Sequence, residues 1–112
     1  MSKVAITGKV KFERNATPFE KATAYVSLLD VSRQDAPSET IAKQVIKNVE
    51  LGEFSFSLSG IIKDPTGMYV VSVHVDVNGD GEVSAGDYIT TGYYQISTQD
   101  EHTAIDVTVQ KV

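Results

Sequence analysis

The chain has 112 residues, the usual size of a single domain, and 41% of them are hydrophobic. Ten lysines and arginines against fifteen aspartates and glutamates give a formal net charge of -5, which disfavours nucleic acid or an anionic membrane surface as a partner. Cysteine is absent, which excludes disulfides, thiolate metal sites and cysteine nucleophiles. No apolar run approaches the ~20 residues that span a bilayer.

Strand-like alternation begins at the N-terminus. Val4, Ile6, Val10 and Phe12 occupy even positions with polar residues between them, a period of two that is typical of a strand and unlike the continuous apolar core of a signal peptide. Similar segments follow, separated by turn formers such as KDPTG at 63–67. The predicted strands are residues 4–12, 23–32, 40–49, 53–59, 68–77, 87–97 and 103–112.

Seven short strands without a 3.6-residue period predict an all-β fold. We expect a single antiparallel β-sandwich of immunoglobulin-like architecture that spans residues 1–112 as one domain. Tryptophan and a cysteine pair are both missing, so the likeness to an antibody domain is one of architecture only.

The third predicted strand, TIAKQVIKNV at residues 40–49, mixes apolar and charged residues. Ile41, Val45 and Val49 are expected on one face, with Lys43 and Lys47 beside them. Lysines in such positions are typical of an edge strand, where they prevent uncontrolled pairing. The segment therefore predicts a sheet edge to which a strand of a protein partner could add.

The segment between the fifth and sixth predicted strands is rich in acid and glycine. DVNGDGEVSAGD, residues 76–87, matches the early positions of the calcium loop D-x-[DN]-x-[DN]-G-x5-E, in which alternate residues turn oxygens inward and glycine permits a sharp reversal. Glu82 would bind through its backbone carbonyl, and Ser84 directly or through water. The predicted Ca2+ ligands are Asp76, Asn78, Asp80, Glu82, Ser84 and Asp87.

The same twelve residues resemble the calcium loop of dockerins, which runs D-x-N-x-D-G and closes with Asp. The following YITTGYYQI is β-branched and aromatic where dockerins have a helix, so Asp87 would come from the start of a strand. The alternative is a polar hairpin turn, since Asn-Gly and Asp-Gly are strong turn signals. A turn leaves Asp76, Glu82 and Asp87 unexplained, so the loop predicts a structural calcium ion.

Two arrangements that could support enzymatic or metal chemistry have little support in the sequence. Ser72, His74 and Asp76 share one strand face, but residues two apart on a strand are ~6.6 Å apart, too far for the hydrogen bond that a nucleophile and base need. His74 and His102 could bind zinc with a carboxylate if the fold brought them together, although lone histidines are more often surface residues.

Three tyrosines suggest a sugar platform. Tyr88, Tyr93 and Tyr94 could stack on a sugar ring, as in carbohydrate-binding β-sandwiches. With a period of two, Tyr93 faces away from Tyr88 and Tyr94, so at least one of the three is expected in the core.

Residues 22–48, ATAYVSLLDVSRQDAPSETIAKQVIKN, resemble the YbaY family of bacterial envelope lipoproteins, related to the pilotin-type lipoprotein of type III secretion systems. The G-x-V of Gly8 to Val10, the segment from Val26 to Pro37 and the I-A-x-Q of Ile41 to Gln44 match the family pattern. The resemblance implies a small non-enzymatic β-sandwich in the envelope, assisting a secreted or outer-membrane protein.

These patterns predict a non-enzymatic, calcium-binding β-sandwich that acts as a binding or accessory module in a bacterial envelope. A carbohydrate-binding module is the alternative, and a small hydrolase is a distant third. An exposed flat tyrosine surface would favour sugar, a concave pocket with a histidine beside a carboxylate would favour an enzyme, and an unprotected edge strand would favour a protein partner.

Overall fold

The computed structural model describes residues 2–14, 16–19, 21–33, 36–79, 81–92 and 94–112. These residues form strands and no α-helix, so none of them belongs to a helix long and apolar enough to cross a membrane. The strands are β1 (Ser2–Phe12), β2 (Ala22–Asp30), β3 (Glu39–Val49), β4 (Phe54–Ile62), β5 (Tyr69–Asp76), β6 (Tyr88–Thr90), β7 (Tyr94–Gln95), β8 (His102–Ala104) and β9 (Val107–Lys111). The all-β prediction is confirmed.

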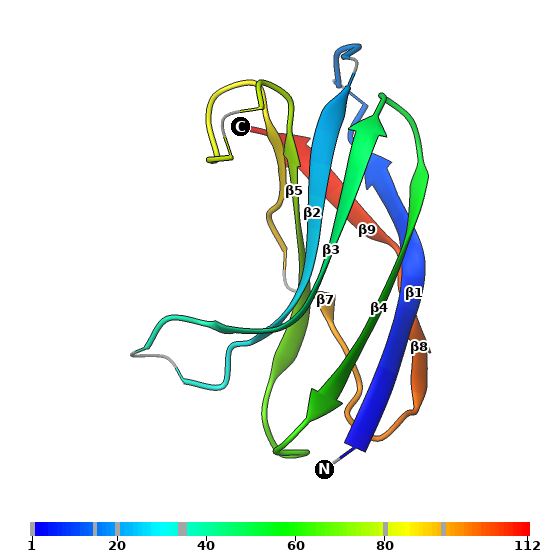
Figure 1. The fold of residues 1–112 in the computed structure, drawn as a ribbon, viewed down its shortest axis with the longest axis vertical. Helices are drawn as coiled ribbons and strands as arrows, with labels where there is room; N and C mark the ends of the chain where they lie inside the picture. Colours follow the sequence, from blue (N-terminus) through cyan, green and yellow to red (C-terminus); the bar gives the residue numbers. More distant parts are fainter. Residues whose placement is uncertain (1, 15, 20, 34–35, 80, 93) are drawn as a thin grey trace.

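The strands form one sheet, in the order β3-β2-β5-β6-β9-β1-β4, which curls into an elongated body of 41 × 29 × 22 Å (Figure 1). The sheet is mixed, because β1 pairs in parallel with β8 and β9 while the other pairs are antiparallel. The expected purely antiparallel, immunoglobulin-like sandwich is therefore corrected to a mixed sheet that forms a nearly closed barrel.

The last two predicted strands are each interrupted. The segment expected at 103–112 divides into β8 and β9, and between them Ile105 donates its N–H to the Thr7 carbonyl of β1 at 2.9 Å. The carbonyl oxygen of Ile105 lies where a Cβ on Gly8 would stand, 1.6 Å from that position. The G-x-V glycine thus lets the chain pass close to β1. The segment expected at 87–97 likewise divides into β6 and β7, which both pair with β5.

The two ends of the sheet, β3 and β4, face one another. Gly60 of β4 has no side chain, and a Cβ there would lie 3.0 Å from the Ile41 side chain of β3. The Gln44 side-chain oxygen accepts a hydrogen bond from the backbone N–H of Ser57 at 2.9 Å. The prediction that β3 lies at a sheet edge is confirmed, but β4 covers part of that edge.

Valines from β1, β2, β5 and β9 dominate the core, together with Ile6, Leu28 and Tyr69. Val49 is buried whereas Val45 is 48% exposed, so the expectation that the two valines share one face is wrong. The cause is a β-bulge: Ala24 lies opposite Ile46 and Ala22 opposite Val49, so three steps along β3 match two along β2. One extra residue exchanges the two faces of a strand.

Candidate functional site

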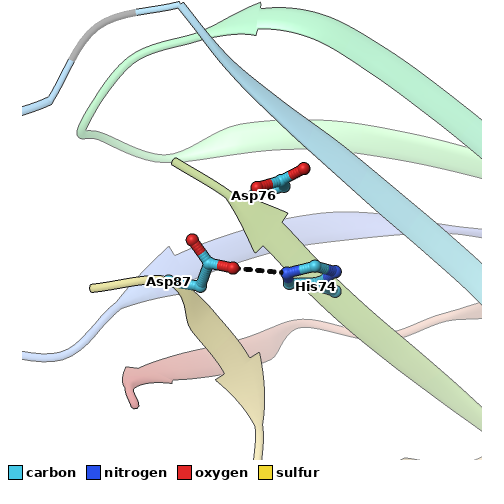
Figure 2. A group of neighbouring side chains, drawn as sticks. All are labelled: His74, Asp76 and Asp87. Carbon is cyan, nitrogen blue, oxygen red and sulfur yellow. Dashed lines mark hydrogen bonds and ion pairs between the residues drawn. The ribbon is translucent and has the colours of Figure 1, made fainter. Parts of the chain in front are cut away.

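The acidic loop connects two strands that are neighbours in the sheet. β5 ends at Asp76, β6 begins at Tyr88, and Asp87 immediately precedes it. The two carboxylates lie side by side at this end of the sheet with His74 next to them (Figure 2). Asp76 is 1% exposed and Asp87 is fully buried, so neither charge is simply a solvated surface acid.

Asp76 organises the first half of the loop. One carboxylate oxygen accepts the backbone N–H of Gly79 at 3.0 Å, and the other accepts that of Gly81 at 2.7 Å. Both glycines have positive φ, 76° and 77°, a conformation that side chains disfavour. The predicted reversal at Gly81 is therefore present, and the loop curls around the Asp76 carboxylate.

Asp87 organises the second half. Its Oδ1 accepts the N–H of Val77 at 2.9 Å, and its Oδ2 accepts the N–H of Ser84 at 3.2 Å and lies 2.9 Å from the His74 Nε2. Burial alone raises the pKa of the Asp87 carboxyl, but the hydrogen bonds from His74, Val77 and Ser84 outweigh it and hold the pKa below its ordinary value of 3.8. The buried carboxylate therefore stays charged at neutral pH.

His74 is a member of the site that the loop pattern did not include. Its ring stacks on Tyr25 at 5.8 Å between centroids, and the Lys43 ammonium lies 4.9 Å from the centre of the Tyr25 ring. The sequence placed His74 two residues before Asp76 on one strand, but its contact with Asp87 depends on the pairing of His74 with Ile89 across β5 and β6.

The structure gathers only part of the predicted ligand set. Asp76 and Asp87 lie together, with ligand atoms of these two and His74 within 4.8 Å of one another. Asn78 donates its side-chain N–H to the Ser84 hydroxyl at 2.9 Å, and Glu82 is exposed. Asp80 lies outside the described residues.

The donor set fits a hard cation in part. Each carboxylate oxygen that accepts one N–H retains lone-pair capacity, and carboxylate oxygens are what calcium prefers. An imidazole nitrogen is not a calcium ligand of choice, so His74 would orient Asp87 and not bind the ion. The hydrogen bonds from the loop backbone already compensate part of the carboxylate charge without an ion.

The other arrangements weighed from the sequence do not form among the residues that the structure describes. His74 bonds Asp87 and not Ser72 or Asp76, so no catalytic triad is assembled. His102 lies on β8, where its Nε2 is 2.9 Å from the Thr7 hydroxyl.

The predicted tyrosine platform is also not assembled. Tyr88 is buried in the core at 1% exposure, and the Tyr94 hydroxyl accepts the N–H of Thr108 at 3.1 Å. Tyr93 lies outside the described residues. Tyr88 therefore has a structural role, as the alternation of the strand led us to expect for at least one of the three.

Comparisons with known proteins match nearly the whole chain and not only the acidic loop. A family model described as the type III secretion system lipoprotein chaperone (YscW) matches residues 1–109. The fold is similar to the solved structure of an alternative pilotin from the type II secretion system of Vibrio cholerae, with a TM-score of 0.75 and 26% sequence identity over 99% of this chain and 98% of that one. No curated protein matches the chain in sequence.

Proposed function

Because the chain belongs to the type III secretion system lipoprotein chaperone (YscW) family, we propose that it is an envelope accessory protein that binds and assists an outer-membrane component of a secretion system. The observation that carries this proposal is the family match over residues 1–109, together with a fold shared with a pilotin. The family is non-enzymatic and envelope-associated. The resemblance to YbaY proteins noted above is a finer assignment that agrees with this role.

The sheet edge at β3 is the element through which we propose that the partner binds. Within the part of the chain that the structure describes, β3 pairs with β2 on one side only, and β4 covers it near Ile41 and Gln44. Beyond Gln44, Val45 is exposed, and residues 46–54, which join β3 to β4, line a hollow. An extended segment of the partner could pair there through backbone hydrogen bonds.

Calcium binding by the acidic loop is the second role that we propose. The supporting observation is that the loop brings Asp76 and Asp87, eleven positions apart in sequence, into one cluster. Calcium would pin the connection between β5 and β6, and its role would be structural. Nothing in the described residues favours the carbohydrate alternative, since Tyr88 is buried and the Tyr94 hydroxyl is bonded to β9.

The docking proposal is tested by site-specific photocrosslinking in cells that express the protein natively. A photoreactive residue replaces Val45 on β3 or, as the control, Gln99, which is exposed on the loop before β8. We expect Val45 to capture one outer-membrane secretion component and Gln99 not to. Deletion of the gene should lower the amount of that component in the outer membrane. Unchanged outer-membrane levels after deletion would contradict the proposed function.

A further inference from the structure

The outward face of three adjacent strands is aligned by their register. Val45 of β3, Tyr25 of β2 and His74 of β5 form one cross-strand row. Lys43, Ser27 and Ser72 form the next row. We call this surface the Lys43 face; a shallow hollow on it is lined by Tyr25, Ser27, Leu29, Lys43, Ser72, His74 and Gly81.

The charge of the Lys43 face differs from that of the whole molecule. The chain carries a formal charge of -5, but residues 40–49 of β3 contain two lysines and no acidic residue. Segments 23–29 of β2 and 69–75 of β5 contain no acidic residue either. Among the described residues neither Lys43 nor Lys47 has an ion-pair partner. Among the residues that line the hollow, Lys43 carries a permanent positive charge, while His74 is hydrogen-bonded to the buried Asp87 carboxylate.

The row that contains Lys43 presents hydrogen-bond donors. Lys43 offers its ammonium, and Ser27 and Ser72 directly across the strands offer hydroxyls; side chains opposite one another are ~5 Å apart at Cβ. A carboxylate, which only accepts hydrogen bonds, could accept one from each of these three groups. Val45 in the adjacent row is 48% exposed and offers an apolar contact.

We propose that the Lys43 face binds an acidic segment of the partner protein, whose carboxylate is received by Lys43 and the two serines and whose neighbouring apolar side chain packs on Val45. This inference rests on the proposed function and names the chemistry of the partner. An anionic lipid surface is less suitable, because recognition of such a surface takes a cluster of about four to eight basic residues, and the two rows that define this face contain one lysine.

The test uses the intact protein and a blocked peptide that contains two glutamates flanking a leucine, with the matched glutamine peptide as control. Amide chemical shifts are followed by NMR while each peptide is titrated to millimolar concentration. We expect only the glutamate peptide to shift the amide resonances of β2, β3 and β5. Salt at about 0.5 M should weaken the binding of this peptide. Lys43→Gln should weaken binding about tenfold, and Lys43→Arg should retain it.

Lys63→Gln, a change at an exposed lysine in the turn between β4 and β5, is the matched control and should bind as the unchanged protein does. Equal binding of the glutamine peptide, shifts confined to another surface, or no binding would overturn the inference. So would a response of these amides to phosphatidylglycerol vesicles with none to the peptide. A failure here combined with a Val45 crosslink to an outer-membrane component would leave the proposed function standing and reject only the acidic chemistry of the partner.

Discussion

Gly8 is the residue at which a single methyl group should matter most. A Cβ at this position would stand 1.6 Å from the carbonyl oxygen of Ile105, which is backbone and cannot rotate away. Gly8→Ala should therefore push apart β1 and the connection between β8 and β9, and we expect the free energy of unfolding to fall by about 3 kcal/mol. Urea unfolding followed by circular dichroism measures this loss.

The matched control is Gly92→Ala. The nearest atom to a Cβ at Gly92 is a ring carbon of Tyr94 at 3.9 Å, an ordinary van der Waals distance. Gly92→Ala should change the free energy of unfolding by no more than about 0.5 kcal/mol. Equal changes in the free energy of unfolding at the two glycines would contradict the expected clash between a Cβ at Gly8 and the Ile105 carbonyl.

Asp87 gives the second prediction at this scale. Asp87→Asn, measured in chelator, loses an acceptor for backbone N–H groups and should cost about 2 kcal/mol. Because the folded-state pKa lies below 3.8, the stabilisation by Asp87 is present above that pH and is lost as the pH falls through the folded-state value. The difference in stability between wild type and variant should thus narrow below pH 3.8. Asp100→Asn, at an exposed position, should show no such difference.

The spacing of residues in the sequence was enough to predict that Asp76 and Asp87 lie close together, since they stand at the two ends of one short loop. It could not include His74, whose contact with Asp87 depends on cross-strand pairing. Nor could it show that backbone N–H groups of Gly79, Gly81 and Val77 would bind the carboxylates. Those bonds depend on the path of the loop backbone, which residue types do not specify.

At the scale of elements, the alternation of apolar and polar residues in the sequence located β1 to β5 well. It failed where partners come from distant parts of the chain. The parallel pairing of β1 with β8 and β9 joins the two ends of the sequence, and no local pattern indicates strand direction. The expectation that Val45 and Val49 share one face was wrong for a similar reason, because a bulge of one residue reverses the faces of β3.

The position of β3 leads to a prediction about its amides. β3 pairs only with β2 among the described residues, whereas β5 is bonded to β2, β6 and β7. Amides from Ile41 to Val49 should exchange with solvent about tenfold faster on average than those of Tyr69–Asp76. Hydrogen exchange followed by NMR resolves the two strands. Protection in β3 equal to that in β5 would mean that β4 closes the barrel fully and would weaken the case for docking at this edge.

At the scale of the whole molecule, the acidic loop touches more than the two strands it connects. Val112, which follows β9, donates its N–H to the Asp87 carbonyl at 2.8 Å, and its own carbonyl accepts the N–H of Gly86 at 3.4 Å. β6 pairs with both β5 and β9, so the loop lies at the junction between the two halves of the curled sheet. Ordering the loop should consequently stabilise the entire sheet.

Calcium should therefore raise the melting temperature of the whole domain in one transition. An ion at 100 times its dissociation constant adds about 2.7 kcal/mol, and an affinity of roughly 10^-4 to 10^-3 M is expected because the short Asp87 side chain occupies the closing position. Magnesium should act much less, since it demands a smaller and stricter octahedron. Asp80→Ala should abolish the calcium effect, while Asp100→Ala should retain it. Identical melting curves in millimolar calcium and in chelator would leave the loop a polar turn, held by the backbone hydrogen bonds to Asp76 and Asp87.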